Sequence, residues 1–365
     1  MSKISWPLSG RIPYLDGLRA FSIATVVIGH SKPYIPFFQS RIAPLADAVL
    51  DGRFGVRVFF VLSGFLITTL LFSEEDKTGR ISITGFYERR IARIFPAFYL
   101  FILTLTALSL LHVVDLQWPA LVTAATFLWN YGSLWGAPSA AAGEVVGHLW
   151  TLSLEEQFHL VWPATLILLG RRRGGQIALA SIIVFPILRV ASYFLIPSTR
   201  GQLMMMFHTG ADMIMWGAVA AYACNNGVLD RFRALKYRAA LPWLCALGLF
   251  VVRPVLDAKI RGAQAIIAPS LECFLIVIFL FWLLSGEGGI LRRILETWPM
   301  VQLGLLSYSL YLWQQLFILS DFTQQFSIYL RLLGALIAAI VSYRLVEIPM
   351  RKRIRGWFAQ SEPAH

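Results

Sequence analysis

One apolar segment near the start of the chain carries two side chains that could do chemistry. It is YLDGLRAFSIATVVIGH, residues 14–30, with Arg19 towards its start and His30 at its end. Eleven positions on an α-helix make three turns plus about 20°, with a rise of about 16 Å, so the two side chains would share one face. An imidazole inside a membrane is costly unless it has a partner or faces a water-filled cavity, so His30 is a functional candidate.

Structural roles explain the same residues differently. His30 could be a packing residue that is satisfied by a hydrogen bond. Arg19 could extend to a lipid phosphate, or it could pair with Asp16 three positions earlier, where Asp16 would cap the helix. The segment by itself leaves these explanations open.

A second candidate is the basic run YERRIARIFP, residues 87–96. Arg90 and Arg93 lie three positions apart and would share a helical face. Guanidinium groups can bind phosphate through two hydrogen bonds at once, so this face is suited to a diphosphate or a 3′-phosphate at the cytoplasmic surface. The alternative is the ordinary positive flank of a membrane span, and the run alone does not separate the two.

The third candidate is GHLWTLSLEEQFHLVWP, residues 147–163. His148, Glu155 and His159 fall at offsets of seven and eleven, so one helical face could present all three. A carboxylate beside an imidazole orients a base and stabilises its protonated form. The alternatives are that His148 precedes the helix and that the tryptophan marks a membrane interface.

The composition indicates which elements must position these side chains. Of the 365 residues, 57% are hydrophobic and only 14% are charged, and long apolar runs recur along the chain. This is typical of a polytopic membrane protein, and we expect an all-α transmembrane bundle of about ten spans. Each segment is close to the ~20 residues that cross the hydrocarbon core, and they lie at about 15–34, 54–72, 94–113, 148–169, 177–196, 204–224, 240–256, 266–285, 300–319 and 327–347.

The positions of the basic residues predict the orientation. With ten spans and a cytoplasmic N-terminus, 22 of the 32 lysines and arginines face the cytoplasm, in agreement with the positive-inside bias. Counting the apolar segment 118–132 as a further crossing would move the basic runs at 171–173 and 231–238 to the outside. We therefore expect this segment to be a surface or re-entrant element, and both termini to be cytoplasmic.

Several function classes lack their sequence signatures. The three cysteines lie far apart without metal-ligand spacing, and no glycine-rich phosphate loop, HExxH or GxSxG element occurs. The net charge of +12 reflects membrane topology rather than nucleic-acid binding. Single charged residues inside apolar segments are explained equally well by interhelical pairing and by catalysis; they are Arg189, Asp212, Glu272 and Glu347.

Six stretches, in this order, resemble the acyltransferase-3 family of integral-membrane acyltransferases. Members of this family O-acylate cell-surface polysaccharides, lipopolysaccharide, peptidoglycan and some antibiotics. The matching stretches are YLDGLRAFSIATVVIGH, GVRVFFVLSGFLIT, RRIARIFPAFYL, HLWTLSLEEQFHLVWP, SYSLYLWQQ and VEIPMR, and they span nearly the whole chain.

The resemblance implies transfer of an acyl group, most simply acetyl, from acyl-CoA to a hydroxyl of a carbohydrate or glycolipid acceptor. Arg19 and His30 match the family's Arg-(ten residues)-His motif, and Arg90 and Arg93 match its RxxR motif. On this basis the catalytic residues are His30 and Glu155, the acyl-CoA phosphates meet Arg19, Arg90 and Arg93, and the supporting residues are Asp16 and His148. The donor would be acetyl-CoA or another acyl-CoA, without a metal.

The chain also departs from the family pattern. It has His159 where the family often has tyrosine, Gln314 where it often has histidine, and Gly210 where an arginine often precedes Asp212 by two positions. No role is assigned to His159, Gln314 or Asp212 for this reason.

The resemblance further implies one membrane domain over residues 1–355, a cytoplasmic tail over 356–365, and no appended esterase-like domain. We expect a multi-pass protein of the bacterial inner (plasma) membrane whose partners are acyl-CoA, the acceptor and membrane lipid, with no nucleic acid. The alternative from another class is a transporter or flippase for a glycan or lipid intermediate, in which His30, Asp212 and Glu272 would relay protons.

Overall fold

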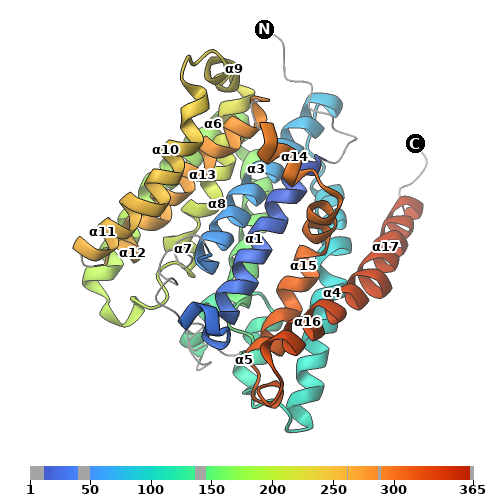
Figure 1. Cartoon of the computed structure of the whole chain (residues 1–365). Helices are drawn as coiled ribbons and strands as arrows, with labels where there is room; N and C mark the ends of the chain where they lie inside the picture. Colours follow the sequence, from blue (N-terminus) through green and yellow to red (C-terminus); the bar gives the residue numbers. More distant parts are fainter. Residues whose placement is uncertain (1–11, 40–49, 136–144, 261, 287–288, 362–365) are drawn as a thin grey trace. The chain divides into compact units, whose positions relative to one another are not determined.

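A computed structural model describes residues 12–39, 50–135, 145–260, 262–286 and 289–361 (Figure 1). Throughout these residues the regular elements are helices, without a strand, so the predicted all-α class is confirmed. Helices satisfy their own backbone hydrogen bonds, which is the requirement that a hydrocarbon environment imposes. Lys3, Arg11, Arg41 and Arg261, which contributed to the orientation count, lie outside the described residues, as do residues 362–365.

The α-helices are α1 (Pro13–Ser31), α3 (Gly52–Thr78), α4 (Ile83–Leu110), α5 (Trp118–Ala125), α6 (Leu149–Leu195), α7 (Phe207–Gly210), α8 (Asp212–Asn225), α9 (Val228–Arg233), α10 (Leu241–Leu247), α11 (Arg253–Lys259), α12 (Ala263–Ile266), α13 (Ala268–Leu284), α14 (Gly289–Leu295), α15 (Trp298–Ile318), α16 (Ile328–Ser342) and α17 (Ile348–Ser361). Short 3₁₀ turns cover Lys32–Tyr34, Pro36–Gln39, Trp129–Trp135, Pro197–Thr199, Arg238–Ala240 and Asp321–Thr323. Two π-helical turns cover Gly248–Val252 and Tyr343–Glu347.

Five continuous helical stretches in the described part of the chain are long and apolar enough to cross a membrane. They are Gly52–Thr78, Ile83–Leu110, Leu149–Leu195, Arg238–Lys259 and Ile328–Ile354, and a sixth results if α13 and α14, which meet at 96°, form one bent span. A multi-pass membrane protein is therefore supported. The count of ten spans and the side on which each terminus lies stay predictions.

Helix α6 contains a break that accounts for part of the difference between the ten predicted spans and the five or six helices that are long enough to cross a membrane. Its 47 residues would extend for about 70 Å as one helix, but the backbone leaves the helical conformation at Gly170, where φ is 72° and ψ is 169°. A Cβ on Gly174 would lie 2.5 Å from Leu166 Cδ2, although residues eight apart in a straight helix are about 12 Å apart. The chain therefore folds back here, between the two spans predicted at 148–169 and 177–196.

The segment 118–132 does not form a long helix. Its regular structure is α5, which has eight residues, followed by the 3₁₀ turn that begins at Trp129. An eight-residue helix is about 12 Å long, well short of the ~30 Å hydrocarbon core. This length agrees with a surface or re-entrant element.

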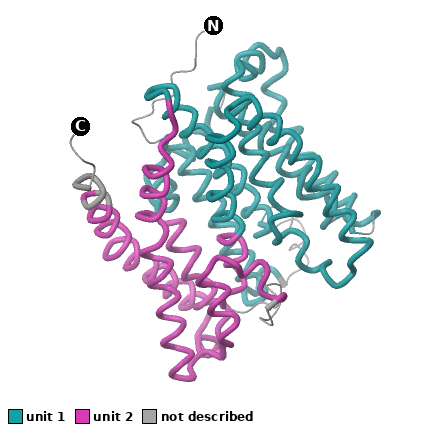
Figure 2. The backbone as a smooth tube through the Cα atoms, turned by 180° about the vertical axis from the view of Figure 1, so that it is seen from behind, with its two compact units in different colours: residues 1–79, 154–305 teal, residues 80–153, 306–365 magenta. Residues whose placement is uncertain are grey.

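The chain forms two compact units, each assembled from two separate stretches of sequence (Figure 2). Unit 1 contains residues 1–79 and 154–305, and unit 2 contains residues 80–153 and 306–365. The expectation of one domain over residues 1–355 stays a prediction. Helix α17 continues beyond residue 355 to Ser361, so the expected tail begins as helix.

Close backbone contacts organise unit 1 around α3. On one side, Gly55 lies against α1, where the Ser22 hydroxyl donates to the Gly55 carbonyl and a Cβ on Gly55 would overlap Thr25 Oγ1. On the other side, a Cβ on Gly64 would overlap the Ile214 carbonyl of α8. Small residues allow membrane helices to approach this closely, so helix packing here depends on glycine.

A buried ion pair joins three further helices of unit 1. Arg189 of α6 donates to both carboxylate oxygens of Asp212 at the start of α8, at 2.7 and 3.1 Å. It also donates to Ser270 Oγ of α13 at 2.9 Å and to the Thr209 carbonyl at 2.6 Å. Interhelical pairing, one of the two explanations open at the sequence level, thus describes these residues. Asp212 lies at a helix start rather than in the middle of a continuous span, because α7 and α8 divide the predicted segment 204–224.

Unit 2 contains α4, α5 and the C-terminal helices. Phe98 of α4 stacks on Phe127 with ring centroids 4.3 Å apart, and Phe101 meets Trp313 edge-on at 5.4 Å. One turn before Phe98 on α4, the Ile94 carbonyl accepts from the Tyr308 hydroxyl at 2.9 Å. Aromatic side chains therefore hold α15 against α4 within this unit.

The α3–α8 contact predicts a strong effect of one added methyl group. A Cβ on Gly217 of α8 would overlap the Val61 carbonyl and lie 2.6 Å from the Phe65 nitrogen of α3. We expect Gly217→Ala to lower the free energy of unfolding by roughly 1–3 kcal/mol. Gly201→Ala is the matched control, because nothing lies within 4 Å of its Cβ. Thermal melting of the two purified variants in detergent tests this, and equal melting temperatures would contradict it.

Candidate catalytic site

His30 lies where the end of α1 meets the start of α3. It is in the last turn of α1 and is half-buried. A Cβ on the preceding Gly29 would lie 2.9 Å from the Gly52 nitrogen, so the two helix ends touch through glycine. The uninterrupted helix Pro13–Ser31 carries both Arg19 and His30, as expected from the sequence. Their common face and separation of about 16 Å therefore follow from helix geometry.

Asp16 and Arg19 form an ion pair at the other end of α1. Arg19 Nη1 lies 2.8 Å from Asp16 Oδ1, and the Asp16 side chain is buried. Asp16 does not cap the helix, contrary to the sequence-based alternative, because α1 begins at Pro13 and its N-cap is Ile12. The Arg19 side chain is 22% exposed, so part of it remains accessible beside its carboxylate partner.

Glu155 belongs to a cluster of four polar side chains within unit 1. The Ser63 hydroxyl of α3 donates to Glu155 Oε1 of α6 at 2.5 Å. His159, one turn after Glu155, places Nε2 at 3.4 Å from Ser63 Oγ and at 3.5 Å from Glu155 Oε1. Its Nδ1 lies 2.9 Å from Glu156 Oε1. A hydroxyl, an imidazole and two carboxylates are thus held together; we name them the Ser63 cluster.

The side chains of the Ser63 cluster differ in how far they are exposed. The His159 side chain is 2% exposed, whereas that of Glu155 is 25% exposed and Ser63 is half-buried. The imidazole is therefore enclosed, and the hydroxyl and one carboxylate remain accessible at its edge. This arrangement can accept a proton from a hydroxyl and retain it, which acyl, phosphoryl and glycosyl transfers to alcohols all require.

Sequence reasoning missed Ser63 and Glu156 and left His159 without a role. One signal was present, since Glu156 lies three positions before His159 on the same helix, a spacing that brings side chains together. Ser63 gave no such signal, because it is 92 residues from Glu155 and the two meet only through tertiary packing.

His148 lies directly before α6 and belongs to unit 2, so a shared helical face describes Glu155 and His159 alone. Gln315 Oε1 accepts from the His148 backbone N–H at 3.1 Å and lies 2.8 Å from its Nδ1. An amide oxygen can only accept, so Nδ1 carries the proton and the neutral ring has its lone pair on Nε2. The Tyr311 hydroxyl donates to the His148 carbonyl at 2.8 Å, which fixes the backbone as well.

Arg90 and Arg93 share a face of α4 in unit 2, as expected from their spacing, because Ile83–Leu110 is one helix. Arg90 is half-buried with its guanidinium 5.9 Å from the Phe86 ring centroid, and Arg93 is exposed. Helix α17 and the π-helical turn before it pack against α4. Within these two elements, Arg351 lies 3.7 Å from the buried Glu347. The charge of Glu347 also interacts with Arg93 of α4. Sequence reasoning counted Arg351 only as a topological charge.

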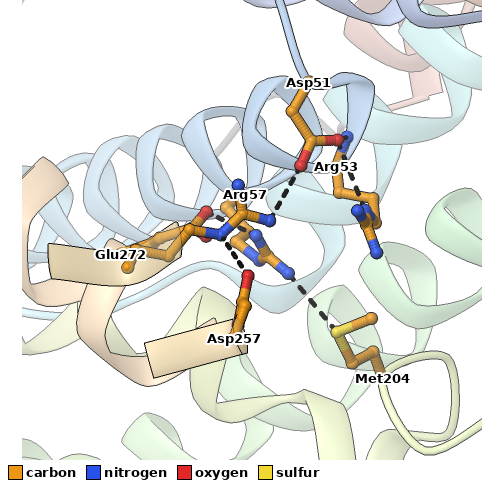
Figure 3. A network of polar contacts seen from close by, with 7 residues as sticks. Asp51, Arg53, Arg57, Met204, Asp257 and Glu272 are labelled. Carbon is orange, nitrogen blue, oxygen red and sulfur yellow. Dashed lines mark hydrogen bonds and ion pairs between the residues drawn. The ribbon is translucent and has the colours of Figure 1, made fainter. Parts of the chain in front are cut away.

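An ion network at the start of α3 lies beside the glycine contact that precedes His30 (Figure 3). Arg57 donates to Glu272 Oε2 and lies 3.4 Å from Met204 Sδ. Arg253 reaches Asp51 at 3.0 Å, Asp257 at 3.0 Å and Glu272 at 3.2 Å. The network ties α11 and α13 to the start of α3.

Asp51 caps α3 by accepting from the Arg53 backbone N–H at 2.9 Å. Burial by itself would raise the pKa of the Asp51 carboxyl. The charge and amide hydrogen bond of Arg53, followed by the charges of Arg57 and Arg253, lower this pKa by more, so it lies below its usual value. The capping carboxylate is therefore ionised wherever the protein is folded near neutral pH.

Among the described residues, no group of three or more His, Cys, Asp and Glu side chains is arranged to hold a metal ion. The buried cationic groups Arg57, Arg189 and Arg253 are matched by carboxylates. The chemistry that these residues support directly is acid–base and nucleophilic.

Comparison with known proteins agrees with this chemistry. A family model described as an acyltransferase domain matches residues 12–345. The O-acetyltransferase OatA of Staphylococcus aureus is 27% identical over 367 residues, covering 94% of this chain and 57% of the relative. The peptidoglycan O-acetyltransferase OatA of Listeria monocytogenes is 25% identical, covering 93% of this chain and 56% of the relative. The chain thus spans a little over half the length of these curated relatives, and no solved structure matches it.

The Asp51 network predicts a pH-dependent stability. Since the folded-state pKa lies below the ordinary 3.8, the charged form stabilises the fold above that pH, and this contribution is lost as the pH falls through 3.8 towards the folded-state value. Asp51→Asn keeps a capping oxygen but removes the charge. We expect it to be less stable than wild type by about 1–3 kcal/mol at pH 7, with a difference that shrinks in acid.

Asp230→Asn is the control for this prediction, because Asp230 forms an exposed i,i+3 pair with Arg233 and such pairs contribute little. Melting temperatures in detergent between neutral and acidic pH provide the measurement. A difference between Asp51→Asn and wild type that stays constant across this range would argue against the charge as its cause.

Proposed function

The chain belongs to the acyltransferase-3 family, and from that premise we propose that it transfers an acetyl group from acyl-CoA to a hydroxyl of a carbohydrate acceptor. The observation that carries the proposal is the Ser63 cluster, which has the proton-transfer groups that O-acylation needs. The acceptor hydroxyl must lose its proton as it attacks the thioester, and the oxyanion that forms must be stabilised.

The arginines support the choice of donor. Coenzyme A carries a diphosphate and a 3′-phosphate, and guanidinium groups bind such anions through paired hydrogen bonds. Arg90 and Arg93 provide two guanidinium groups on one face of α4, and Arg351 of α17 adds a further positive charge. The resemblance to the family motif, rather than the geometry, adds Arg19 to these donor contacts; its side chain is partly exposed beside Asp16 on α1. A proton-coupled transporter has no need of such groups.

His30 and Glu155 take the catalytic roles in this proposal. His30 accepts the proton of the acceptor hydroxyl at the far end of the α1 face from Arg19. The separation of about 16 Å suits the extended pantetheine arm between the phosphates and the thioester. Glu155 Oε1 lies 3.5 Å from Nε2 of the enclosed His159 and accepts from Ser63, so it is placed to orient a reacting hydroxyl or an imidazole. Asp16 supports the arrangement by pairing with Arg19. His148 supports it by holding Gln315 in place within unit 2.

The acceptor is proposed to be a cell-surface glycan, such as an exopolysaccharide, lipopolysaccharide or peptidoglycan unit. One relative is named for peptidoglycan, and the other for O-acetyl transfer alone. A multi-pass enzyme of the bacterial inner membrane would meet the donor on the cytoplasmic side and such a glycan on the other side. The apolar helices are consistent with this placement.

The test of the proposed function is a transfer assay with full-length protein in detergent, [¹⁴C]acetyl-CoA and a mixture of cell-envelope glycans. We expect release of free CoA together with acetylated glycan. A transporter or flippase would bind the glycan without releasing CoA, so glycan binding without CoA release or acetylated product would overturn the proposal.

His30→Ala tests the assigned base. We expect kcat/KM to fall by at least 10²-fold, the usual contribution of a positioned general base, with an unchanged amount of inserted protein. His208→Ala is the control, because His208 is an exposed histidine of α7 outside the proposed site. Equal losses in the two variants, or full activity of His30→Ala, would remove His30 from the mechanism.

Arg90→Lys and Arg93→Lys test the phosphate contacts. Each keeps a positive charge but loses the paired hydrogen bonds, so we expect the KM for acetyl-CoA to rise by about tenfold with a smaller change in the KM for the glycan. Arg89→Lys, an exposed neighbour on α4, provides the control. A donor KM that stays within twofold of wild type in both variants would exclude these arginines from donor binding.

A further inference from the structure

Ser63, like Ser270 and Ser309, donates its hydroxyl to a carboxylate of another element, and it also has an imidazole nitrogen, His159 Nε2, at 3.4 Å. Hydroxyl side chains in apolar helices commonly donate to a carbonyl one turn earlier in their own helix. Thr69 of α3 does so, donating to the Phe65 carbonyl at 2.7 Å, and Thr104 of α4 donates to the Leu100 carbonyl at 2.9 Å. Ser63 instead donates across to Glu155 of α6. Its hydroxyl is therefore directed at a proton acceptor rather than used to satisfy its own helix.

The order of atoms around Ser63 is that of an activated nucleophile. The hydroxyl is bonded to a carboxylate, and His159 Nε2 lies 3.4 Å from the same oxygen. The Nδ1 of that ring lies 2.9 Å from Glu156 Oε1, so this carboxylate holds the ring beside Ser63 and Glu155. A hydroxyl bonded to a carboxylate base, with a neighbouring ring that orients this carboxylate, has the components of a covalent catalytic site.

We propose that Ser63 is a covalent acyl carrier, with Glu155 as its base and His159 as a residue that positions Glu155. The proposal rests on the acyl-CoA-dependent function above and assigns that function an intermediate. All four side chains of the cluster lie within unit 1, on α3 and α6, so the site is complete in one compact unit.

The two half-reactions balance as follows. Ser63 Oγ attacks the thioester carbonyl, its proton moves to Glu155, an O–C bond forms, and the C–S bond breaks. Glu155 then returns the proton to the departing sulfur, which leaves as the CoA thiol. In the second half, the acceptor hydroxyl attacks the acyl-serine and gives its proton to His30, the base assigned above. A new O–C bond forms, the acyl bond to Ser63 Oγ breaks, and that oxygen takes up the proton that His30 releases. No oxidant, reductant or further reactant is needed.

Labelling without acceptor tests the carrier. Full-length protein in detergent is treated with [¹⁴C]acetyl-CoA, quenched in acid, digested and analysed by mass spectrometry. We expect the mass of one acetyl group on the peptide that contains Ser63. An acetyl-serine ester survives mild acid and neutral hydroxylamine, whereas an acetyl-imidazole on His30 does not, so the chemistry of release also identifies the carrier.

Three variants make the result decisive. Ser63→Ala should lose the label and at least 10²-fold in transfer rate. Ser63→Cys preserves the side-chain shape and should form a thioester that neutral hydroxylamine releases. Thr69→Ala, which removes a hydroxyl bonded only to its own helix, is expected to label as wild type does. Melting temperatures close to wild type for the two Ser63 variants would show that they fold.

A separate measurement tests the positioning role. His159→Gln should slow formation of the label in a single turnover by tenfold or more, while the KM for acetyl-CoA stays within twofold. A residue that only stabilises the fold would lower the amount of active protein without changing the rate per active molecule, and that result would remove His159 from the proposal.

The outcomes separate this inference from the proposed function. Transfer to glycan that persists in Ser63→Ala, or a label found on His30, overturns the serine carrier and leaves the acetyltransferase function standing. Absence of both CoA release and transfer by the wild-type protein overturns both. A hydroxylamine-resistant label on Ser63, lost in Ser63→Ala, supports both.

Discussion

The close approach of α3 to α1 and α8 is the contact on which the rest of unit 1 depends. Glycines at positions 55, 64 and 217 leave no room for a Cβ, so the helix backbones themselves meet. In a hydrocarbon environment no hydrophobic effect drives helices together, and packing at this distance provides the association energy. The same packing fixes the rotation of α3, and thereby decides that Ser63 faces α6 and that Gly52 meets the end of α1.

Buried polar groups impose a different constraint, because each needs a hydrogen-bonding or oppositely charged partner where water is excluded. Arg189 and Asp212, and Arg57 and Glu272, pair deep inside unit 1 and are satisfied by opposite charge. The Ser63 cluster differs from them, since it holds two carboxylates and one imidazole with a hydroxyl at its accessible edge. Buried ion pairs of the first kind can be wholly structural. A cluster that is able to gain or lose a proton is better suited to chemistry.

The proposed function brings these features together. Family membership over residues 12–345 makes acyl transfer the premise, and the proposed donor contacts are arginines, which bind phosphate through paired hydrogen bonds. His30 and Ser63 both belong to unit 1, on α1 and α3, which meet through glycine. The arrangement explains why a chain with no soluble hydrolase motif can nevertheless hold an activated hydroxyl: its nucleophile and base come from helices that are distant in sequence.

The sequence by itself determined much about this protein. Apolar runs predicted an all-helical membrane protein, and helical spacing placed Arg19 with His30, Arg90 with Arg93, and Glu155 with His159. These inferences succeeded because they rest on local periodicity, which a helix preserves. The roles assigned to His30, Glu155 and the arginines stay predictions.

Only the tertiary structure decided which distant groups meet. Ser63 and Glu155 are 92 residues apart, and Arg57 and Glu272 are 215 apart. The position of His148 outside α6 also depended on it, whereas the break at Gly170 lies between two spans that the apolar runs predicted. Such contacts follow from side-chain packing between helices. This packing produces no periodic pattern in the sequence, so the sequence alone does not predict which residues meet.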